Sequence, residues 1–244
     1  VALYSSFLQR AYDQVVHDVA TQNLHVVFAL DRAGLVGNDG ETHQGVFDAA
    51  FLSQIPNMTV MAPADYREFE NMLEFAVNEH NAPISIRYPR GSSSVTVNRS
   101  DTPVARGKGI VVEAGRDISI IASGKMVSTA LEVRTLLAEK GINAEVVNLR
   151  FIKPLDENLV RKTASKTGRV VIIDEAPADG TFAYKLMSML PENTRTLIKT
   201  LPDEFIRHGS VDELLKLNRM DAQSIASEAI EKFYGGYFNH EKIS

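Results

Sequence analysis

Cysteine is absent from the 244 residues of this chain. Its absence excludes disulfide frameworks and thiolate metal sites, and leaves no argument for an oxidising compartment. Long apolar runs are also missing, because no stretch approaches the roughly twenty apolar residues that span a bilayer. The first ten residues lack the basic region and long apolar core of a secretory signal. We therefore expect a cytoplasmic protein without a membrane partner.

Long basic runs are absent too, and the formal net charge is −5. A net negative charge gives no general reason to bind nucleic acid or an anionic surface. Four histidines are scattered along the chain and predict no metal site: His17, His25, His80 and His240. We expect small molecules, rather than nucleic acid, as partners.

Apolar segments of strand character alternate with helical patterns along the whole chain. In the first half we expect strands at 25–30, 58–62 and 84–88, and helices from Ser5 or Ser6, at 46–54 and at 65–79. In the second half we expect strands near 110–113, 118–122, 143–148, 169–173 and 195–199, and helices at 126–140, from Pro154, near 180–190, at 210–217 and at 221–233. Along the helix at 65–79, the side chains expected to face the core are Phe69, Leu73, Phe75 and Ala76.

This alternation indicates largely parallel sheets covered on both faces by helices. A polar stretch poor in large apolar side chains separates the two halves. We therefore expect two consecutive three-layer α/β domains with mostly parallel sheets, at 1–91 and 109–236, with a linker at 92–108 and a tail at 237–244. The first helical pattern begins without an initiator Met or a preceding strand, so we expect that chain is missing upstream.

The loop Asp31–Gly45 differs from the amphipathic patterning around it. It follows the apolar run Val26–Leu30 and holds four glycines, three acids, an arginine and a histidine. Glycines permit left-handed dihedrals and close approach of the backbone to a ligand. Because open α/β sheets bind ligands beyond the carboxyl ends of their strands, we expect a site here. The alternative is a long surface turn whose polar residues only turn the chain.

Four motifs, in this order along the chain, resemble a known family: Tyr4–Gln14, Asp31–Gly45, Arg87–Gly91 and Leu201–Gly209. Two α/β domains with such a loop are typical of the thiamine-dependent transketolase superfamily, and the motifs resemble its 1-deoxy-D-xylulose-5-phosphate synthase family. The match covers nearly all of the chain, but only the family's pyrimidine-binding and C-terminal domains. The family's first domain, which carries the diphosphate and Mg2+ ligands, has no counterpart here. Neither has the activating glutamate that lies just upstream of Tyr4 in the family.

The resemblance implies condensation of pyruvate with D-glyceraldehyde 3-phosphate to 1-deoxy-D-xylulose 5-phosphate and CO2, at the head of non-mevalonate isoprenoid synthesis. It further implies thiamine diphosphate and Mg2+ as cofactors and a homodimer. The carbanion chemistry belongs to the thiamine, while protein groups position substrates, move protons and hold the phosphate. Without the diphosphate-binding domain, we expect this chain alone to be inactive.

His43 is the best candidate for proton transfer, because imidazole titrates near neutrality and a loop at a strand end can present it to substrate. From the residues alone, a surface histidine bonded to its own loop is the alternative. The resemblance of Thr42 to Gly45 to the family's loop implies a catalytic or substrate-orienting role. Asp39 alone would be a turn former. The resemblance implies that it orients His43 or contacts the reacting substrate, so we assign both residues to catalysis and substrate binding.

Tyr4 and Phe7 are three residues apart and so share a face at a helix start. Aromatic residues at this spacing are usually core residues. The resemblance implies instead that Phe7 stacks on the thiamine pyrimidine and that Tyr4 lines the cofactor and substrate pocket. Arg32 and Arg90 each follow a strand, and two guanidinium groups at one sheet edge can grip a phosphate. Exposed ion pairing is their alternative, whereas the resemblance implies binding of the triose phosphate.

One stretch departs from the family, because residues 174–182 lack the tandem glycines that usually follow the acidic strand end. We expect an altered turn into the next helix. Two other functions fit the sequence. The chain could be the separate smaller subunit of a transketolase or 2-oxo-acid dehydrogenase, or a non-catalytic α/β module that docks a partner.

Overall fold

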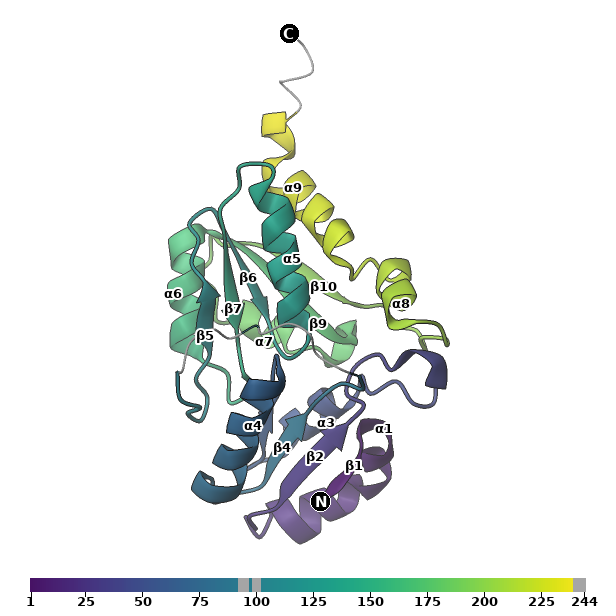
Figure 1. Ribbon diagram of the computed structural model, residues 1–244. Coiled ribbons are helices and arrows are strands. Elements are labelled where there is room, and N and C mark those ends of the chain that lie inside the picture. The colour runs from purple at the N-terminus through teal and green to yellow at the C-terminus, as the bar shows by residue number, and fades with distance from the viewer. Residues whose placement is uncertain (92–96, 98–101, 239–244) are drawn as a thin grey trace.

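Two five-stranded sheets, flanked by helices, make up the fold (Figure 1). The computed structural model describes residues 1–91, 97 and 102–238. The first sheet has the strand order β1-β2-β4-β3-β8 and the second has the order β10-β9-β6-β7-β5. Among these described strands, only the neighbouring pairs β3–β8 and β5–β7 are antiparallel. The sheets confirm the expected α/β class with mostly parallel strands.

The first sheet consists of β1 (Ala2–Tyr4), β2 (Val27–Asp31), β3 (Thr59–Met61), β4 (Ile84–Arg87) and β8 (Phe151–Lys153). Its helical elements are α1 (Ser5–Leu8), η1 (Gln9–Ala11), α2 (Tyr12–Gln14), η2 (Val15–Ala20), α3 (Asp48–Gln54), α4 (Tyr66–Glu74) and η4 (Phe75–Glu79). Two expectations were wrong at the start of the chain. A strand precedes the first helix, and Tyr4 rather than Ser5 or Ser6 occupies the N-cap, without a side-chain cap bond. Three residues are too few to show the alternation that predicts a strand.

Helices cover both faces of the first sheet. On one face, Met72 of α4 packs in a cluster with Ile86 of β4. On the other, Leu8 of α1 and Leu52 of α3 belong to a separate buried cluster. Leu73, which we expected to face the core, is 37% exposed, whereas Met72 is fully buried. Successive helix residues point about 100° apart, so a one-residue shift in phase exchanges the inner and outer positions.

The second sheet consists of β5 (Ile110–Glu113), β6 (Ile118–Ala122), β7 (Ala144–Asn148), β9 (Arg169–Pro177) and β10 (Arg195–Leu201). Its helices are α5 (Met126–Ala138), α6 (Glu157–Thr167), α7 (Ala183–Met187), α8 (Val211–Leu217) and α9 (Ala222–Phe238). The helix expected from Pro154 begins at Glu157 instead, after Asp156, whose carboxylate accepts from the Leu159 amide at 3.1 Å. The residues just before Pro154 form β8, which crosses over to pair with β3 of the first sheet.

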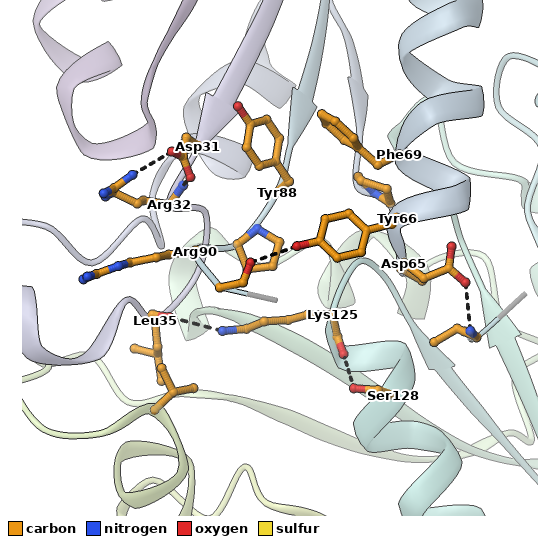
Figure 2. A pocket seen from close by; sticks show the side chains of 16 residues that line it. Asp31, Arg32, Leu35, Asp65, Tyr66, Phe69, Tyr88, Arg90, Lys125 and Ser128 are labelled. Carbon is orange, nitrogen blue, oxygen red and sulfur yellow. Dashed lines mark hydrogen bonds and ion pairs between the residues drawn. The ribbon is translucent and has the colours of Figure 1, made fainter. Parts of the chain in front are cut away.

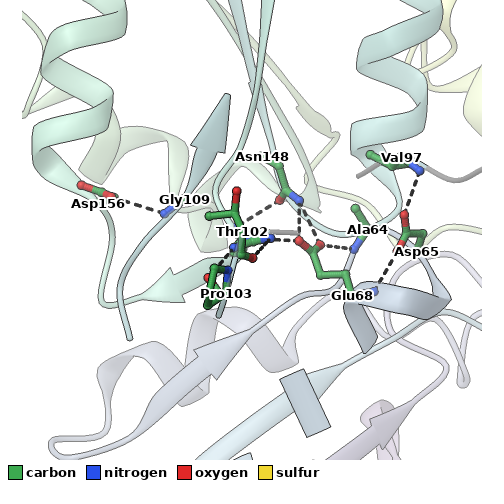
Figure 3. A network of polar contacts seen from close by, with 10 residues as sticks. Ala64, Asp65, Glu68, Val97, Thr102, Pro103, Gly109, Asn148 and Asp156 are labelled. Atoms are coloured by element: carbon green, nitrogen blue, oxygen red, sulfur yellow. Dashed lines mark hydrogen bonds and ion pairs between the residues drawn. The ribbon is translucent and has the colours of Figure 1, made fainter. Parts of the chain in front are cut away.

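A buried polar network also joins the two halves (Figure 3). The carboxylate of Glu68, on α4, accepts hydrogen bonds from Arg150 Nε at 2.7 Å and Asn148 Nδ2 at 2.9 Å. Arg150 also donates to the carbonyls of Thr102 and Pro103. A charge buried this deeply needs its partners, because an unpaired one costs several kcal/mol. The network therefore fixes how the halves sit against each other.

The structure describes only part of the expected linker and of the expected tail. Most of the linker at 92–108 and of the tail at 237–244 lies outside the described residues, although α9 runs to Phe238. Within the described part of the chain, no helix has the length and apolar character to cross a bilayer.

Candidate active site

The loop Asp31–Gly45 leaves the carboxyl end of β2 and lies against the second half of the chain (Figure 1). Gly34, Gly37 and Gly40 have φ values of 81°, 78° and 78°, which side-chain-bearing residues rarely adopt. Gly45 is needed for space instead, because a Cβ there would lie 2.0 Å from the Arg32 carbonyl oxygen. The expected left-handed turns and close approaches are therefore present.

Three aromatic side chains meet at one side of this loop: Tyr4, Phe7 and His43. The Tyr4 and Phe7 rings stack with centroids 5.3 Å apart, and Phe7 meets His43 edge-on at 5.4 Å. Phe7 remains 43% exposed, so the alternative reading of it as a core residue is wrong. Nδ1 of His43 lies 2.9 Å from Oγ1 of Thr42. An exposed ring beside an imidazole leaves room for a flat heterocycle to stack.

Arg32 and Arg90, called here the arginine pair, lie beside the aromatic group. The Arg32 guanidinium carbon is 3.8 Å from the Tyr4 ring centroid, and its Nη1 donates to Asp31 at 2.6 Å. Nη1 of Arg90 donates to both carboxylate oxygens of Asp39 at 2.9 Å. Arg32 Nε is 3.9 Å from the same carboxylate and is buried without a hydrogen-bond partner among the described residues. Two carboxylates therefore face the two guanidinium groups, and Arg32 Nε keeps an unused donor.

The structure thus brings together all six residues expected from the sequence: Tyr4, Phe7, Arg32, Asp39, His43 and Arg90. Asp39 contacts both members of the arginine pair, and its two expected roles stay predictions. Sequence reasoning gave no role to Asp31, although its position directly before Arg32 at a strand end was a signal for an ion-pair partner.

A cavity of about 600 Å³ borders the arginine pair (Figure 2). Tyr66, Phe69 and Tyr88 line it together with the arginine pair. Burial raises the pKa of the Tyr88 hydroxyl, and the nearby Asp31 carboxylate adds to this effect. Since its walls combine aromatic faces with guanidinium groups, the cavity suits a small anionic molecule with an apolar portion.

Buried charges behind the loop support it, and sequence reasoning missed them. Arg87 of β4 donates from Nε to Asp48 Oδ2 at 2.9 Å, and both side chains are at least nine-tenths buried. Asp174, within β9, accepts from the Thr181 hydroxyl at 2.7 Å. Burial raises the Asp174 pKa to about 6, against these hydrogen bonds and the charge of Arg87. In the described residues, no cluster of three or more His, Asp or Glu could hold a metal ion.

Comparison with known proteins places this geometry in a family. The chain matches the models of the transketolase pyrimidine-binding domain over residues 1–94 and of the transketolase C-terminal domain over residues 107–225. A solved split-gene transketolase, in an inactive beta4 tetramer, has a TM-score of 0.86 and 26% identity, covering 95% of this chain and 75% of that chain. The chain therefore belongs to the transketolase family, as the sequence motifs led us to expect.

Within that family, the chain resembles the 1-deoxy-D-xylulose-5-phosphate synthases. The synthase of Chlorobaculum tepidum is 44% identical over 237 residues, which are 96% of this chain and 37% of that protein. Those of Heliobacterium modesticaldum and Desulforudis audaxviator are 46% and 48% identical over 95% and 86% of this chain, and over 36% and 34% of their own lengths. The chain thus spans little more than a third of these relatives, which agrees with a resemblance limited to two domains.

Proposed function

We propose that this chain is the pyrimidine-binding and C-terminal portion of a 1-deoxy-D-xylulose-5-phosphate synthase. The complete enzyme would condense pyruvate with D-glyceraldehyde 3-phosphate to 1-deoxy-D-xylulose 5-phosphate and CO2. The observation that carries the proposal is the arginine pair held beside the Tyr4, Phe7 and His43 rings. An anion site beside a stacking surface and a titratable imidazole is what a phosphorylated aldehyde acceptor requires.

Each residue of the site has a chemical duty in this proposal. The arginine pair binds the acceptor phosphate by charge-assisted hydrogen bonds. His43 moves a proton at the carbonyl oxygen of the acceptor as the new carbon–carbon bond forms. Tyr4 packs under Arg32 and fixes the direction of its guanidinium group.

Thiamine diphosphate is the proposed cofactor, and the residues present fit its pyrimidine end. The exposed face of Phe7 can stack on an aminopyrimidine, and the buried Ser5 and Ser6 hydroxyls beside it lack hydrogen-bond partners among the described residues. When bound, thiamine diphosphate supplies the electron sink for decarboxylation of pyruvate. By the family resemblance, the ligands of its diphosphate and of Mg2+ belong to the family's amino-terminal domain.

Reconstitution tests the proposal. The chain alone should bind thiamine diphosphate weakly and release no CO2 from labelled pyruvate. The same chain joined to the family's amino-terminal domain, or mixed with it, should release CO2 only when glyceraldehyde 3-phosphate is present. Robust turnover by a preparation that mass spectrometry shows to contain this chain alone would contradict the expected inactivity. No CO2 release by the joined protein would contradict the proposed reaction.

A second function is favoured by the likeness to a split-gene transketolase, whose subunits are separate chains. The chain would then be the smaller subunit of a two-chain enzyme that transfers a ketol group. Supplying a ketose phosphate in place of pyruvate distinguishes the two enzymes, because a ketol transfer releases no CO2. A non-catalytic module would process neither donor in any combination. Size measurement of the joined protein would test the homodimer that we propose for the complete enzyme.

A further inference from the structure

Two residues from the second half of the chain hold the base of the site loop. The Glu175 carboxylate accepts from the Leu35 amide at 3.1 Å, and Lys125 Nζ donates to the Leu35 carbonyl at 3.2 Å. Glu175 and Lys125 are themselves 2.8 Å apart, and the Glu175 side chain is 5% exposed. Both polar groups of one loop residue are therefore held by an ion pair from the other half. Lys125 lies beside Leu35 in Figure 2.

Gly34 makes this contact possible. A Cβ at Gly34 would lie 2.0 Å from Glu175 Oε2, so the carboxylate occupies the space that a side chain would need. Gly34 also exchanges two backbone hydrogen bonds with Gly45, at 2.7 and 2.8 Å. A shift of Leu35 would therefore also move Gly45, at the other end of the loop.

Gln44 holds that far end. Its side chain is buried, accepts from the Val36 amide at 2.8 Å and donates to the Arg207 carbonyl at 3.2 Å. Gln44 directly follows His43 in the sequence, so the second half of the chain reaches both ends of the loop. A bond to a backbone carbonyl depends on the path of the chain and not on the side chain at position 207.

Arg32 is the residue that most needs this support. Its φ of 61° places it in the left-handed region, which costs a side-chain-bearing residue roughly 1–3 kcal/mol. Such a conformation persists only when the surrounding structure imposes it. Arg32 lies two residues before Gly34, and His43 lies two residues before Gly45. The Glu175–Lys125 ion pair therefore acts on the two parts of the loop that carry Arg32 and His43.

We propose that Glu175 and Lys125 are positioning residues that set the placement of Arg32 and His43 from the C-terminal half. Glu175 is not among the residues that line the cavity beside the arginine pair, whereas Lys125 lines it and can also contact a bound anion directly. The catalytic consequence rests on the proposed function, whereas the effect on loop placement and anion binding does not. A purely structural ion pair would instead stabilise the contact between the halves without changing anion affinity.

The first experiment uses the full 244-residue chain and inorganic phosphate as the probe. Glu175→Ala should speed hydrogen exchange of the Leu35 amide by about tenfold or more and weaken phosphate binding by a similar factor, as loss of a supporting hydrogen bond commonly does. Glu175→Gln keeps an acceptor oxygen for Leu35 and should fall between Glu175→Ala and the unmodified chain. Because Lys125 also lines the cavity, the readout for Lys125→Met, which keeps an apolar stem, is hydrogen exchange of the Leu35 amide, which should speed up.

Glu228→Ala is the matched control. Glu228 pairs with Lys199 at 2.7 Å in the same half of the chain and is also largely buried, but it belongs to α9, away from the loop. It should change thermal stability without changing Leu35 exchange or phosphate affinity. Equal phosphate affinity in Glu175→Ala and the unmodified chain, or equal weakening in Glu228→Ala, would overturn the proposal.

Kinetics of the joined protein separates positioning from stability. Displacement of a catalytic group by about 1 Å can cost a hundredfold in rate, so Glu175→Ala should lower kcat by up to about that factor. The KM for pyruvate should stay within about twofold, because the pyruvate site is not the displaced part. Inactivity of the unmodified joined protein would count against the proposed function, while the exchange and phosphate results would still decide the positioning role. An unchanged kcat beside an active unmodified protein would contradict positioning.

Discussion

Both carboxylate oxygens of Asp39 accept hydrogen bonds from the same Arg90 nitrogen, each at 2.9 Å. Asp39 therefore occupies the guanidinium group of Arg90, which we assign to binding of the acceptor phosphate. Arg90 is 49% exposed in its side chain and Asp39 is 31% exposed, so the pair is screened by water and contributes little stability. A phosphate dianion can displace such a carboxylate.

The first prediction concerns this competition. Asp39→Asn removes the negative charge that a phosphate must displace, so inorganic phosphate should bind the chain about five- to tenfold more tightly. Calorimetric titration at low and high salt measures the change, which should shrink as salt screens the charges. In the joined protein, the same variant should lower turnover, because Asp39 is also assigned to the reacting substrate. Weaker phosphate binding by Asp39→Asn would show that the acid supports the anion site instead of competing with the anion.

The second prediction concerns proton transfer by His43. His43→Ala in the joined protein should lower kcat by about a hundredfold or more, the usual contribution of a positioned acid or base. His17→Ala is the control, because His17 is an exposed histidine paired with Asp13 on a helix outside the loop. It should leave kcat unchanged. An unaltered kcat in His43→Ala would return His43 to a role in holding its own loop through Thr42.

The third prediction concerns acceptor recognition. Arg32→Ala and Arg90→Ala should each weaken use of glyceraldehyde 3-phosphate by about ten- to a hundredfold, because a hydrogen bond to a charged group contributes roughly 1.5–3 kcal/mol. Steady-state kinetics with unphosphorylated glyceraldehyde provides the comparison, since this acceptor cannot use the arginine pair. The exposed Arg161, which pairs with Glu157, provides a control substitution to Ala. Equal losses for both acceptors would mean that the arginines support the fold.

The fourth prediction concerns pH. The Asp174 pKa is raised by burial to about 6 from 3.8, so the folded state holds its proton more tightly than the unfolded chain does. Its contribution to stability is therefore greatest below pH 4, falls as pH rises towards 6, and is constant above that. A shift of roughly two units corresponds to about 3 kcal/mol.

Asp174→Asn isolates this contribution, because other groups titrate in the same range. The variant should gain stability relative to the unmodified chain between pH 4 and pH 7, measured by denaturant unfolding at each pH. The same difference at pH 4 and pH 7 would show that folding does not raise the pKa of Asp174, and that Arg87 and the hydrogen bonds offset its burial.

The sequence predicted the alternation of strands and helices because each long element buries apolar side chains at a characteristic spacing. This spacing is two residues in a strand and three to four in a helix. β6 coincides with its expected range, 118–122, and β2, β4 and β7 lie within a residue or two of theirs. The strands β1 and β8 were missed, because each has three residues and is defined by its partner strand. No local pattern indicates such a pairing.

The site was predictable to a different degree. Its loop could be found from composition, and its residues from the family's motifs. The contacts that assemble it could not, because Arg90 meets Asp39 across 51 positions and Glu175 meets Leu35 across 140. Side chains that far apart are brought together by the fold alone. Glu175, an acid within β9, gave no local signal that it contacts a loop in the other half of the chain.

Identification of the product tests the central claim most directly. The chain joined to the family's amino-terminal domain would be incubated with thiamine diphosphate, Mg2+, carbon-13-labelled pyruvate and glyceraldehyde 3-phosphate, and the mixture followed by carbon-13 nuclear magnetic resonance. We expect labelled 1-deoxy-D-xylulose 5-phosphate and CO2 in equal amounts, only when both parts and both substrates are present. Absence of this product, or ketol transfer from a ketose phosphate in its place, would contradict the proposed function.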